Sequence, residues 1–123
     1  MNPGDSPLIY KVCAAAEWRA AKALGCYEGA PVDLEDGFIH FSAPQQLRET
    51  VRRYFAESGD LVLVEVASGT LGIALKWEPS RGGDLFPHLY GELPLSAVTR
   101  EWDLPLAADG LRVFPVDVEF ADG

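Results

Sequence analysis

Positive charge, long apolar runs and paired cysteines are scarce in this sequence, and each shortage excludes a class of protein. The 123 residues include 10 Lys and Arg against 19 Asp and Glu, which gives a formal net charge of −9. Such a chain is repelled by a nucleic-acid backbone and by an anionic membrane surface. No apolar run approaches the roughly 18 residues of a membrane span, and the N-terminus lacks the basic and apolar regions of a signal peptide. We expect a cytoplasmic protein with no nonspecific nucleic-acid partner and no membrane partner.

The two cysteines, Cys13 and Cys26, bracket an expected helix. At about 1.5 Å per residue, a helix of that span separates them by roughly 20 Å, which is too far for a disulfide. Neither belongs to a Cys-x-x-Cys pair, so the sequence offers no support for zinc or thioredoxin chemistry. We predict two free thiols, no metal site and no resident cofactor.

Internal repeats and low-complexity segments are also missing from this chain. Hydrophobic residues make up 48% of it, which is enough to bury a core in a chain of this length. We predict a single domain over residues 1–123, with a core from about 8 to 116 and frayed ends.

Two helices are predicted in the N-terminal half. Residues 14–24 are alanine-rich, and Gly25 is placed to end that helix as a C-terminal cap. Ser42 is a candidate N-cap for the second helix, because Gln45 completes a capping-box pattern. This helix should end near residues 58–59, and its apolar face consists of Leu47, Val51, Tyr54 and Phe55.

The remaining pattern predicts strands, with a loop through Gly29, Pro31 and Asp36-Gly37. Residues 60–67 are rich in β-branched side chains and should form a central strand. Shorter strands are expected at 8–12, 38–41, 71–77, 89–90, 97–102 and 113–116. Early helices followed by strands favour an α+β fold over an alternating parallel sheet. The expected core consists of Trp18, Leu47, Val51, Phe55 and the strand 61–66.

Histidine is scarce too, and both histidines lie in short aromatic motifs beside turn residues. His40 lies in Asp36-Gly37-Phe38-Ile39-His40-Phe41-Ser42, and His88 in Phe86-Pro87-His88-Leu89-Tyr90-Gly91. Histidine is the side chain whose charge changes near neutral pH. We predict that the two imidazoles line one cleft, within about 10 Å of each other. The alternative is that both are hydrogen-bonded core residues.

Ser42 lies two residues after His40, so on a strand both side chains face the same side. An imidazole and a hydroxyl at a helix N-terminus would favour an anionic ligand. Ser42 is therefore a candidate ligand-binding residue, and its alternative role is that of a plain helix cap.

Residues 76–91 form the second cluster of candidate site residues. Ser80-Arg81-Gly82-Gly83 is a loop in which Arg81 carries a cation and the glycines allow close approach of an anion. Trp77, Phe86 and Tyr90 together could supply one flat surface for a base or another ring. The alternative is that the glycines only form turns and the aromatics only pack the core. The acidic residues Asp33, Glu35, Asp36, Glu101 and Asp103 are predicted to be solvated surface.

Tyr10, the two histidine motifs and Leu75-Lys76-Trp77-Glu78 together resemble the bacterial and plant family known as domain of unknown function 952. The resemblance runs from about Leu8 to Trp102. It implies an ADP-ribosyltransferase-like fold, with a split antiparallel β core whose cleft holds NAD in the true transferases. It implies no established activity. With this resemblance, the predicted fold is α+β, with such a split core and two helices in the N-terminal half.

Lys11 departs from the pattern of the family, whose members often carry a histidine at this point of the first strand. An ammonium cannot act as a neutral imidazole acceptor, and its preferred ligand is an anion. This departure disfavours NAD-dependent transfer and favours a phosphate-bearing small molecule. Lys11 and Arg81 are the predicted anion-binding end of the cleft.

The predicted function is a cleft for a nucleotide or related phosphate compound, and whether the protein is an enzyme stays open. If it is one, the implied reaction is ADP-ribosyl or N-glycosidic transfer, in which a carboxylate stabilises a cationic sugar. Glu78 is the first candidate for that carboxylate and Glu65 the second, while His40 or His88 would orient the substrate or exchange a proton. The alternatives are a noncatalytic binding module and a purely structural or interaction domain.

Overall fold

The computed structural model describes residues 8–55, 59–108 and 112–115, except for the side chains of Tyr54 and Arg81. It is a mixed α+β fold with antiparallel sheets, as predicted. The strands are β1 (Leu8–Ala14), β2 (Cys26–Tyr27), β3 (Ile39–His40), β4 (Leu61–Ala67), β5 (Leu75–Pro79), β6 (Leu85–Leu89), β7 (Leu93–Pro94) and β8 (Val98–Asp103). The helices are α1 (Ala15–Leu24), α2 (Pro31–Asp36) and α3 (Pro44–Tyr54), with 3₁₀ turns η2 (Ser68–Ala74), η3 (Arg81–Gly83) and η4 (Leu95–Ala97).

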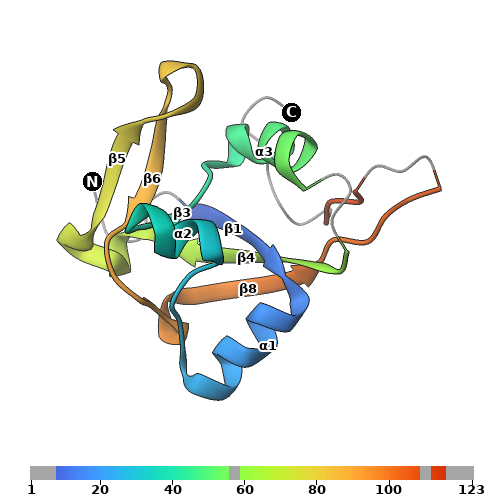
Figure 1. Cartoon of the computed structure of the whole chain (residues 1–123), viewed down its shortest axis with the longest axis horizontal. Coiled ribbons are helices and arrows are strands. Elements are labelled where there is room, and N and C mark those ends of the chain that lie inside the picture. The colour runs from blue at the N-terminus through green and yellow to red at the C-terminus, as the bar shows by residue number, and fades with distance from the viewer. Residues whose placement is uncertain (1–7, 56–58, 109–111, 116–123) are drawn as a thin grey trace.

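The central sheet has the strand order β1-β4-β8 and separates α1 from α3 (Figure 1). Strand side chains alternate between the two faces of a sheet, and almost every side chain of β4 is buried. Its face with Val62 and Val64 packs against Trp18 of α1, whereas its face with Leu61 and Leu63 packs against α3.

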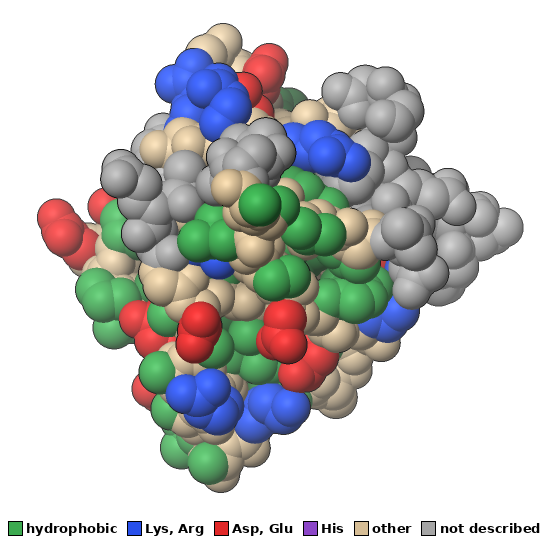
Figure 2. Space-filling view, turned by 90° about the vertical axis from the view of Figure 1, so that its right-hand side faces the viewer, with side chains coloured by type: hydrophobic (Ala, Val, Ile, Leu, Met, Phe, Trp, Pro, Cys, Tyr) green, Lys and Arg blue, Asp and Glu red, His purple; other side chains and the backbone are tan. Residues whose placement is uncertain are grey.

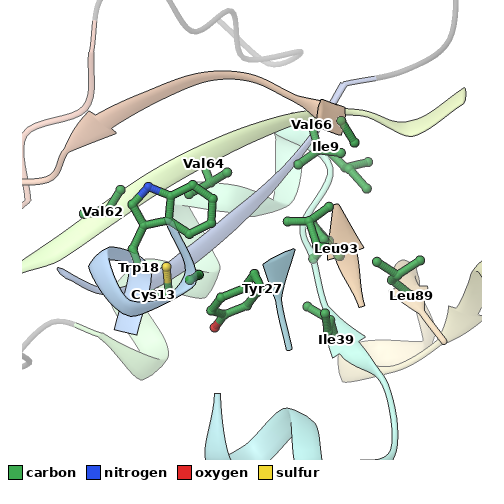
Figure 3. Packing of buried hydrophobic residues seen from close by; sticks show 13 residues of the cluster. Ile9, Cys13, Trp18, Tyr27, Ile39, Val62, Val64, Val66, Leu89 and Leu93 are labelled. Carbon is green, nitrogen blue, oxygen red and sulfur yellow. The ribbon is translucent and has the colours of Figure 1, made fainter. Parts of the chain in front are cut away.

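The core is therefore divided into two clusters, one on each face of the sheet. The cluster around Trp18 also receives residues from the smaller sheets, as Figure 3 shows. The α3 cluster contains Leu47 and Val51 of the predicted apolar face, which confirms these two core residues. Phe55 is only partly buried at the edge of this cluster, so it contributes less to the core than predicted. Both cysteines are free thiols, and burial raises the pKa of Cys13 to about 12.

A second three-stranded sheet has the order β3-β6-β5, and the ribbon β5–β6 projects from the body of the molecule (Figure 1). The two-stranded sheet β2-β7 lies beside the first core cluster through Tyr27 and Leu93. A bridge between Tyr10 and Ser42 connects β1 to the segment that follows β3.

Helix α2 is the main element that the sequence pattern missed. The segment was predicted to be a loop, but Pro31 occupies the first turn and Gly37 ends the helix with a φ of 89°. The Asp33 carboxylate accepts a hydrogen bond from the Ala30 N–H at 2.8 Å, which stabilises the helix start. Proline and glycine thus bound a short helix here instead of marking an irregular loop.

Ser42 is not the cap of α3, which corrects the sequence prediction. Its backbone N–H and C=O are both paired with Tyr10, at 2.8 Å, and this bridge keeps Ser42 extended. The helix instead begins at Pro44 with Ala43 as N-cap, and Gln46, not Gln45, accepts a hydrogen bond from the Ala43 N–H. The helix ends at Tyr54, earlier than predicted.

Among the strands, the prediction for residues 60–67 is confirmed by β4. The predicted strand 71–77 begins only at Leu75, because η2 occupies the residues before it. Residues 113–115 of the predicted strand 113–116 belong to no strand, and residue 116 lies outside the described residues. The neighbouring Arg112 makes an isolated bridge with Leu106.

Within the described residues, no helix is both long enough and apolar enough to cross a bilayer. Figure 2 shows one face of the molecule, on which acidic, basic and apolar side chains are interspersed and no described imidazole is visible.

Replacing Leu47 with alanine should lower the free energy of unfolding by about 2–5 kcal/mol, because Leu47 is fully buried and the change leaves a cavity. Leu34→Ala on α2 is the matched control. Its side chain is 65% exposed, so the same deletion should change stability by less than about 0.5 kcal/mol. Urea denaturation of both variants checks this. Equal losses would contradict the assignment of α3 to the core.

Candidate active site

The pairing of β3 with β6 places His40 directly opposite His88. The neighbouring Phe41 N–H donates to the Pro87 carbonyl, so His40 and His88 form a non-hydrogen-bonded pair, whose Cα atoms approach to about 4.5 Å. Their ring centroids are 5.5 Å apart, and both line one cleft of about 500 Å³. The predicted proximity of the two histidines is thus confirmed.

His40 is held between two carboxylates of α2. Its Nδ1 lies 2.5 Å from Asp33 Oδ1, and its Nε2 lies 3.0 Å from Asp36 Oδ2. An ionised carboxylate can only accept a hydrogen bond, and a neutral imidazole has only one N–H to donate. His40 can therefore donate to both carboxylates only as an imidazolium, which has a proton on each nitrogen. Both ring nitrogens of His40 therefore contact side chains of α2.

Asp33 is buried, which contradicts the prediction that it is a solvated surface residue. Its other oxygen pairs with Lys11 Nζ at 2.8 Å, and the side chains of both partners are almost fully buried. Burial opposes ionisation of Asp33, but hydrogen bonds from His40, Lys11 and the Ala30 N–H outweigh it and lower its pKa to about 2. The predicted anion-binding lysine is thus paired inside the protein.

His88 is paired with a different carboxylate. Its Nδ1 lies 2.8 Å from Glu78 Oε1, and the Tyr90 hydroxyl donates to the same oxygen at 2.8 Å. The hydrogen bonds from His88 and Tyr90 lower the pKa of Glu78, and the same contact raises the pKa of Tyr90. Across the described ranges, no protein group forms a hydrogen bond with Nε2 of His88. Glu78 is therefore placed to orient His88.

Phe38 is a contributor to the site that sequence analysis did not single out. Its ring stacks on His88 with centroids 4.1 Å apart and an interplanar angle of 19°, and it lies 4.6 Å from His40. The signal was present in the sequence, because Phe38 lies two residues before His40 and shares its strand face. Packing against Phe38 restricts both imidazoles.

The cleft combines apolar walls with a few polar groups. Ser42 lines it, and its hydroxyl donates to Thr50 at 3.2 Å. The other lining residues are Tyr10, Lys11, Val12, Val32, Asp33, His40, Phe41, Thr50, Phe55, Ser80, Phe86 and His88.

Trp77 does not share a surface with Phe86 and Tyr90, which corrects the prediction of one aromatic platform. Trp77 is opposite Pro87 in the β5–β6 register, whereas Glu78 is opposite Phe86. Side chains of consecutive residues point to opposite faces, so Trp77 faces away from His88. The side chain of Arg81, the other predicted anion-binding residue, lies outside the described residues.

Glu65, the second candidate carboxylate, is committed to a buried network. Arg100 contacts both of its oxygens, at 3.0 and 2.9 Å, and the hydroxyls of Tyr10 and Thr99 donate to it. Burial opposes its ionisation, but these hydrogen bonds lower its pKa. It pairs with Tyr10 on the α3 face of the central sheet, so it has a structural role. In the part of the chain that the structure describes, no three His, Cys, Asp or Glu side chains are grouped to hold a metal ion.

Comparison with known proteins gives a family and a set of solved structures. The profile of a family described as "Protein of unknown function (DUF952)" matches residues 12–101. The crystal structure of protein CC0527 from Caulobacter crescentus is 56% identical, with a TM-score of 0.82, over 86% of this chain and 93% of that chain. A double-mutant crystal structure of CC0527 is 54% identical, with the same TM-score and coverage. The solution NMR structure of CC0527 is 56% identical, with a TM-score of 0.74, over 85% of this chain and 90% of that chain. No curated protein matches the sequence.

Replacing Asp33 with asparagine should lower the free energy of unfolding by about 3–5 kcal/mol at pH 7, because it leaves the Lys11 ammonium buried without a counter-charge. Asp36→Asn is the matched control, since the Asp36 side chain is 44% exposed and its loss should cost less than about 1 kcal/mol. Chemical denaturation measures both. A double variant, Asp33→Asn with Lys11→Met, should recover part of the loss. A double variant no more stable than Asp33→Asn would contradict the ion-pair argument.

The ionisation of Asp33 should also appear in the acid limb of the stability curve. The folded-state pKa of about 2 lies below the ordinary value of 3.8, so the carboxylate stabilises the fold at pH values above about 4. This contribution, about 2 kcal/mol, should disappear as the pH falls from 4 to 2. Stability should therefore fall more steeply over this range in the natural protein than in Asp33→Asn, as measured by urea denaturation at each pH. Parallel curves would refute the assignment.

Proposed function

This chain belongs to the family of proteins of unknown function DUF952, and we propose a function for it from the site itself. The cleft between His40 and His88 binds a small molecule that carries a hydroxyl-rich ring, and His88 exchanges a proton with it.

The pairing of His88 with Glu78 carries this proposal. A carboxylate that accepts a hydrogen bond from Nδ1–H holds the imidazole in one tautomer and leaves the lone pair on Nε2. The His88–Glu78 contact of 2.8 Å has this geometry, and His88 lines the cleft. The arrangement is that of a general base acting on a bound water or hydroxyl group.

His40 has a different role in this proposal. Both of its ring nitrogens are engaged by Asp33 and Asp36, so it is not placed to accept a proton. It forms a polar wall beside the bound molecule. The two histidines are thus divided into a positioning group and a proton acceptor.

The cleft favours a nucleoside-like ligand. A volume of about 500 Å³ falls within the range of ordinary ligand pockets, and mostly apolar walls with a few polar groups are typical of such sites. The Lys11 charge is neutralised by Asp33, while Asp36 and Glu78 add two negative charges close to the imidazoles, against the one ammonium of Lys76, which lies over the Tyr90 ring. A neutral sugar fits this balance better than a free anion. A phosphate group would need a cation other than Lys11.

The same balance of charge suits the cleavage of an N-glycosidic bond. The bond between the sugar carbon and the base nitrogen breaks, and its electron pair leaves with the base. Water then bonds to the sugar carbon and gives a proton to His88, which returns it to the base. The sugar becomes cationic in the transition state, and the negative charge of the nearby carboxylates stabilises that cation.

The ADP-ribosyltransferase-like core that the family resemblance implies belongs to the same proposal. Its support is the division of the strands into the sheets β1-β4-β8 and β3-β6-β5, with side chains of both sheets lining the cleft.

Ligand binding is tested by thermal unfolding with adenosine, AMP, NAD and ribose 5-phosphate. At a hundredfold excess over its dissociation constant, a ligand that binds only the folded protein adds about 2.7 kcal/mol of stability. We expect adenosine to stabilise the protein against thermal unfolding. AMP should stabilise it more than adenosine only if the cleft contains a phosphate site. A flat response to all four compounds would favour a purely structural domain.

Turnover is tested by chromatographic detection of the base released from adenosine, AMP and NAD. His88→Gln and Glu78→Gln should slow that release by about 100-fold or more, because they remove the base or its orienting carboxylate. Glu28→Gln, at an exposed glutamate before α2, is the matched control and should leave the rate unchanged. Binding without base release would identify the protein as a noncatalytic module, and release at the full rate by His88→Gln would exclude His88 as the base.

A further inference from the structure

A second hollow lies on the other side of the β5–β6 ribbon. It has a volume of about 650 Å³ and lies between α3 and the ribbon. In the register of β5 and β6, Lys76 is opposite His88 and Trp77 is opposite Pro87. Side chains alternate along each strand, so the ribbon presents Trp77 and Leu85 to this hollow and presents Phe86 and His88 to the His40–His88 cleft.

Exposed apolar surface gives the hollow a flat wall. The indole of Trp77 is 38% exposed and Leu85 is 52% exposed, and both line it. Trp77 and Leu85 are neighbours on this wall, and adjacent exposed apolar side chains lined by polar groups are typical of a ligand-binding surface. The proposed function does not use Trp77.

The polar groups of the hollow lie opposite this wall. Gln45 and Asp84 line it, and among the described side chains, which do not include that of Arg81, no group forms a hydrogen bond with either of them. Gln45 offers both a donor and an acceptor, and Asp84 offers two acceptor oxygens. These groups match the hydroxyl groups of a sugar.

Among the described side chains, the charges around the hollow nearly cancel. The Glu49 carboxylate is paired with Arg52 at 2.5 Å and with Arg53 at 2.6 Å. These two positive charges are balanced by the negative charges of Glu49 and of Asp84, which also lines the hollow. These described groups leave no net charge to attract an ion, and an uncharged molecule pays no desolvation penalty for a charge.

The walls of the hollow are held in place before any ligand arrives. The Gln46 side chain donates to the Leu85 carbonyl at 2.7 Å and accepts from the Ala43 N–H at 2.9 Å, which connects the start of α3 to the ribbon. A preformed site loses less conformational entropy on binding than a mobile one.

We propose that this second hollow binds an uncharged pyranose ring, which stacks on the Trp77 indole and donates hydroxyl hydrogen bonds to Asp84. The ring is either a free sugar or a residue of a longer glycan. The proposal does not depend on the His40–His88 cleft.

The test follows the indole N–H signals of the protein by NMR during titration with methyl β-D-glucopyranoside, cellobiose and glucose 6-phosphate. We expect a saturable shift of the Trp77 signal with the first two compounds. Trp77→Ala and Asp84→Asn should each weaken binding by about tenfold or more, as judged from the shifts of neighbouring backbone amides. Tighter binding of cellobiose indicates a glycan, and equal binding indicates a free sugar.

Asp103→Asn, at an exposed aspartate of β8, is the matched control for Asp84→Asn and should bind as the natural protein does. His88→Gln should also bind normally, so a failure of the proposed function leaves this result unaffected. The absence of a saturable shift with every compound, tighter binding of glucose 6-phosphate than of the methyl glucoside, or full affinity in Asp84→Asn would each overturn the proposal.

Discussion

The cleft depends on one buried carboxylate, that of Asp33. A charge withdrawn from water is tolerated only when counter-charges and hydrogen bonds satisfy it. Asp33 meets this condition with Lys11 from β1, the Ala30 N–H at the start of α2, and the ring and backbone N–H of His40 from β3. One side chain of α2 therefore joins β1, which lies about 20 positions earlier in the sequence, to the neighbouring strand β3. Without the Asp33 carboxylate, the Lys11 ammonium would be buried without its counter-charge, and the His40 imidazole would keep only the Asp36 contact.

The alternation of side chains along the β5–β6 ribbon separates the two concavities of the molecule. Its register places Lys76 opposite His88 and Trp77 opposite Pro87, and proline has no N–H to donate. Pro87 is tolerated because its carbonyl still accepts the hydrogen bond from the Phe41 N–H of the segment after β3. A single ribbon thereby supplies His88 and Glu78 to one concavity and Trp77 to another. The separation of the two concavities is a direct consequence of the two-residue period of a strand.

The small number of positive charges in the sequence also affects the two concavities. Three cations near the two concavities have an acidic partner: Lys11 is paired with Asp33, and Arg52 and Arg53 share Glu49. Residue types alone favoured a phosphate ligand for Lys11, because an exposed ammonium prefers an anion. In the tertiary structure that anion is Asp33, which lies 22 positions away and which the sequence pattern predicts to be a surface residue.

The sequence by itself determined the α+β class, the central strand, the approximate extent of α1, the apolar face with Leu47 and Val51, and the two histidine motifs. These features depend on local periodicity and on nearby residue types, which are visible in a linear chain. Only the tertiary structure decided that Ser42 pairs with Tyr10 instead of capping α3, that Pro31–Asp36 is a helix, and that Trp77 faces away from His88. It also decided the partner of each histidine: Asp33 and Asp36 for His40, and Glu78 for His88. The physical reason is that strand register and the desolvation of charged groups depend on contacts between distant segments, and a carboxylate is buried or solvated according to which counter-charge the fold brings to it.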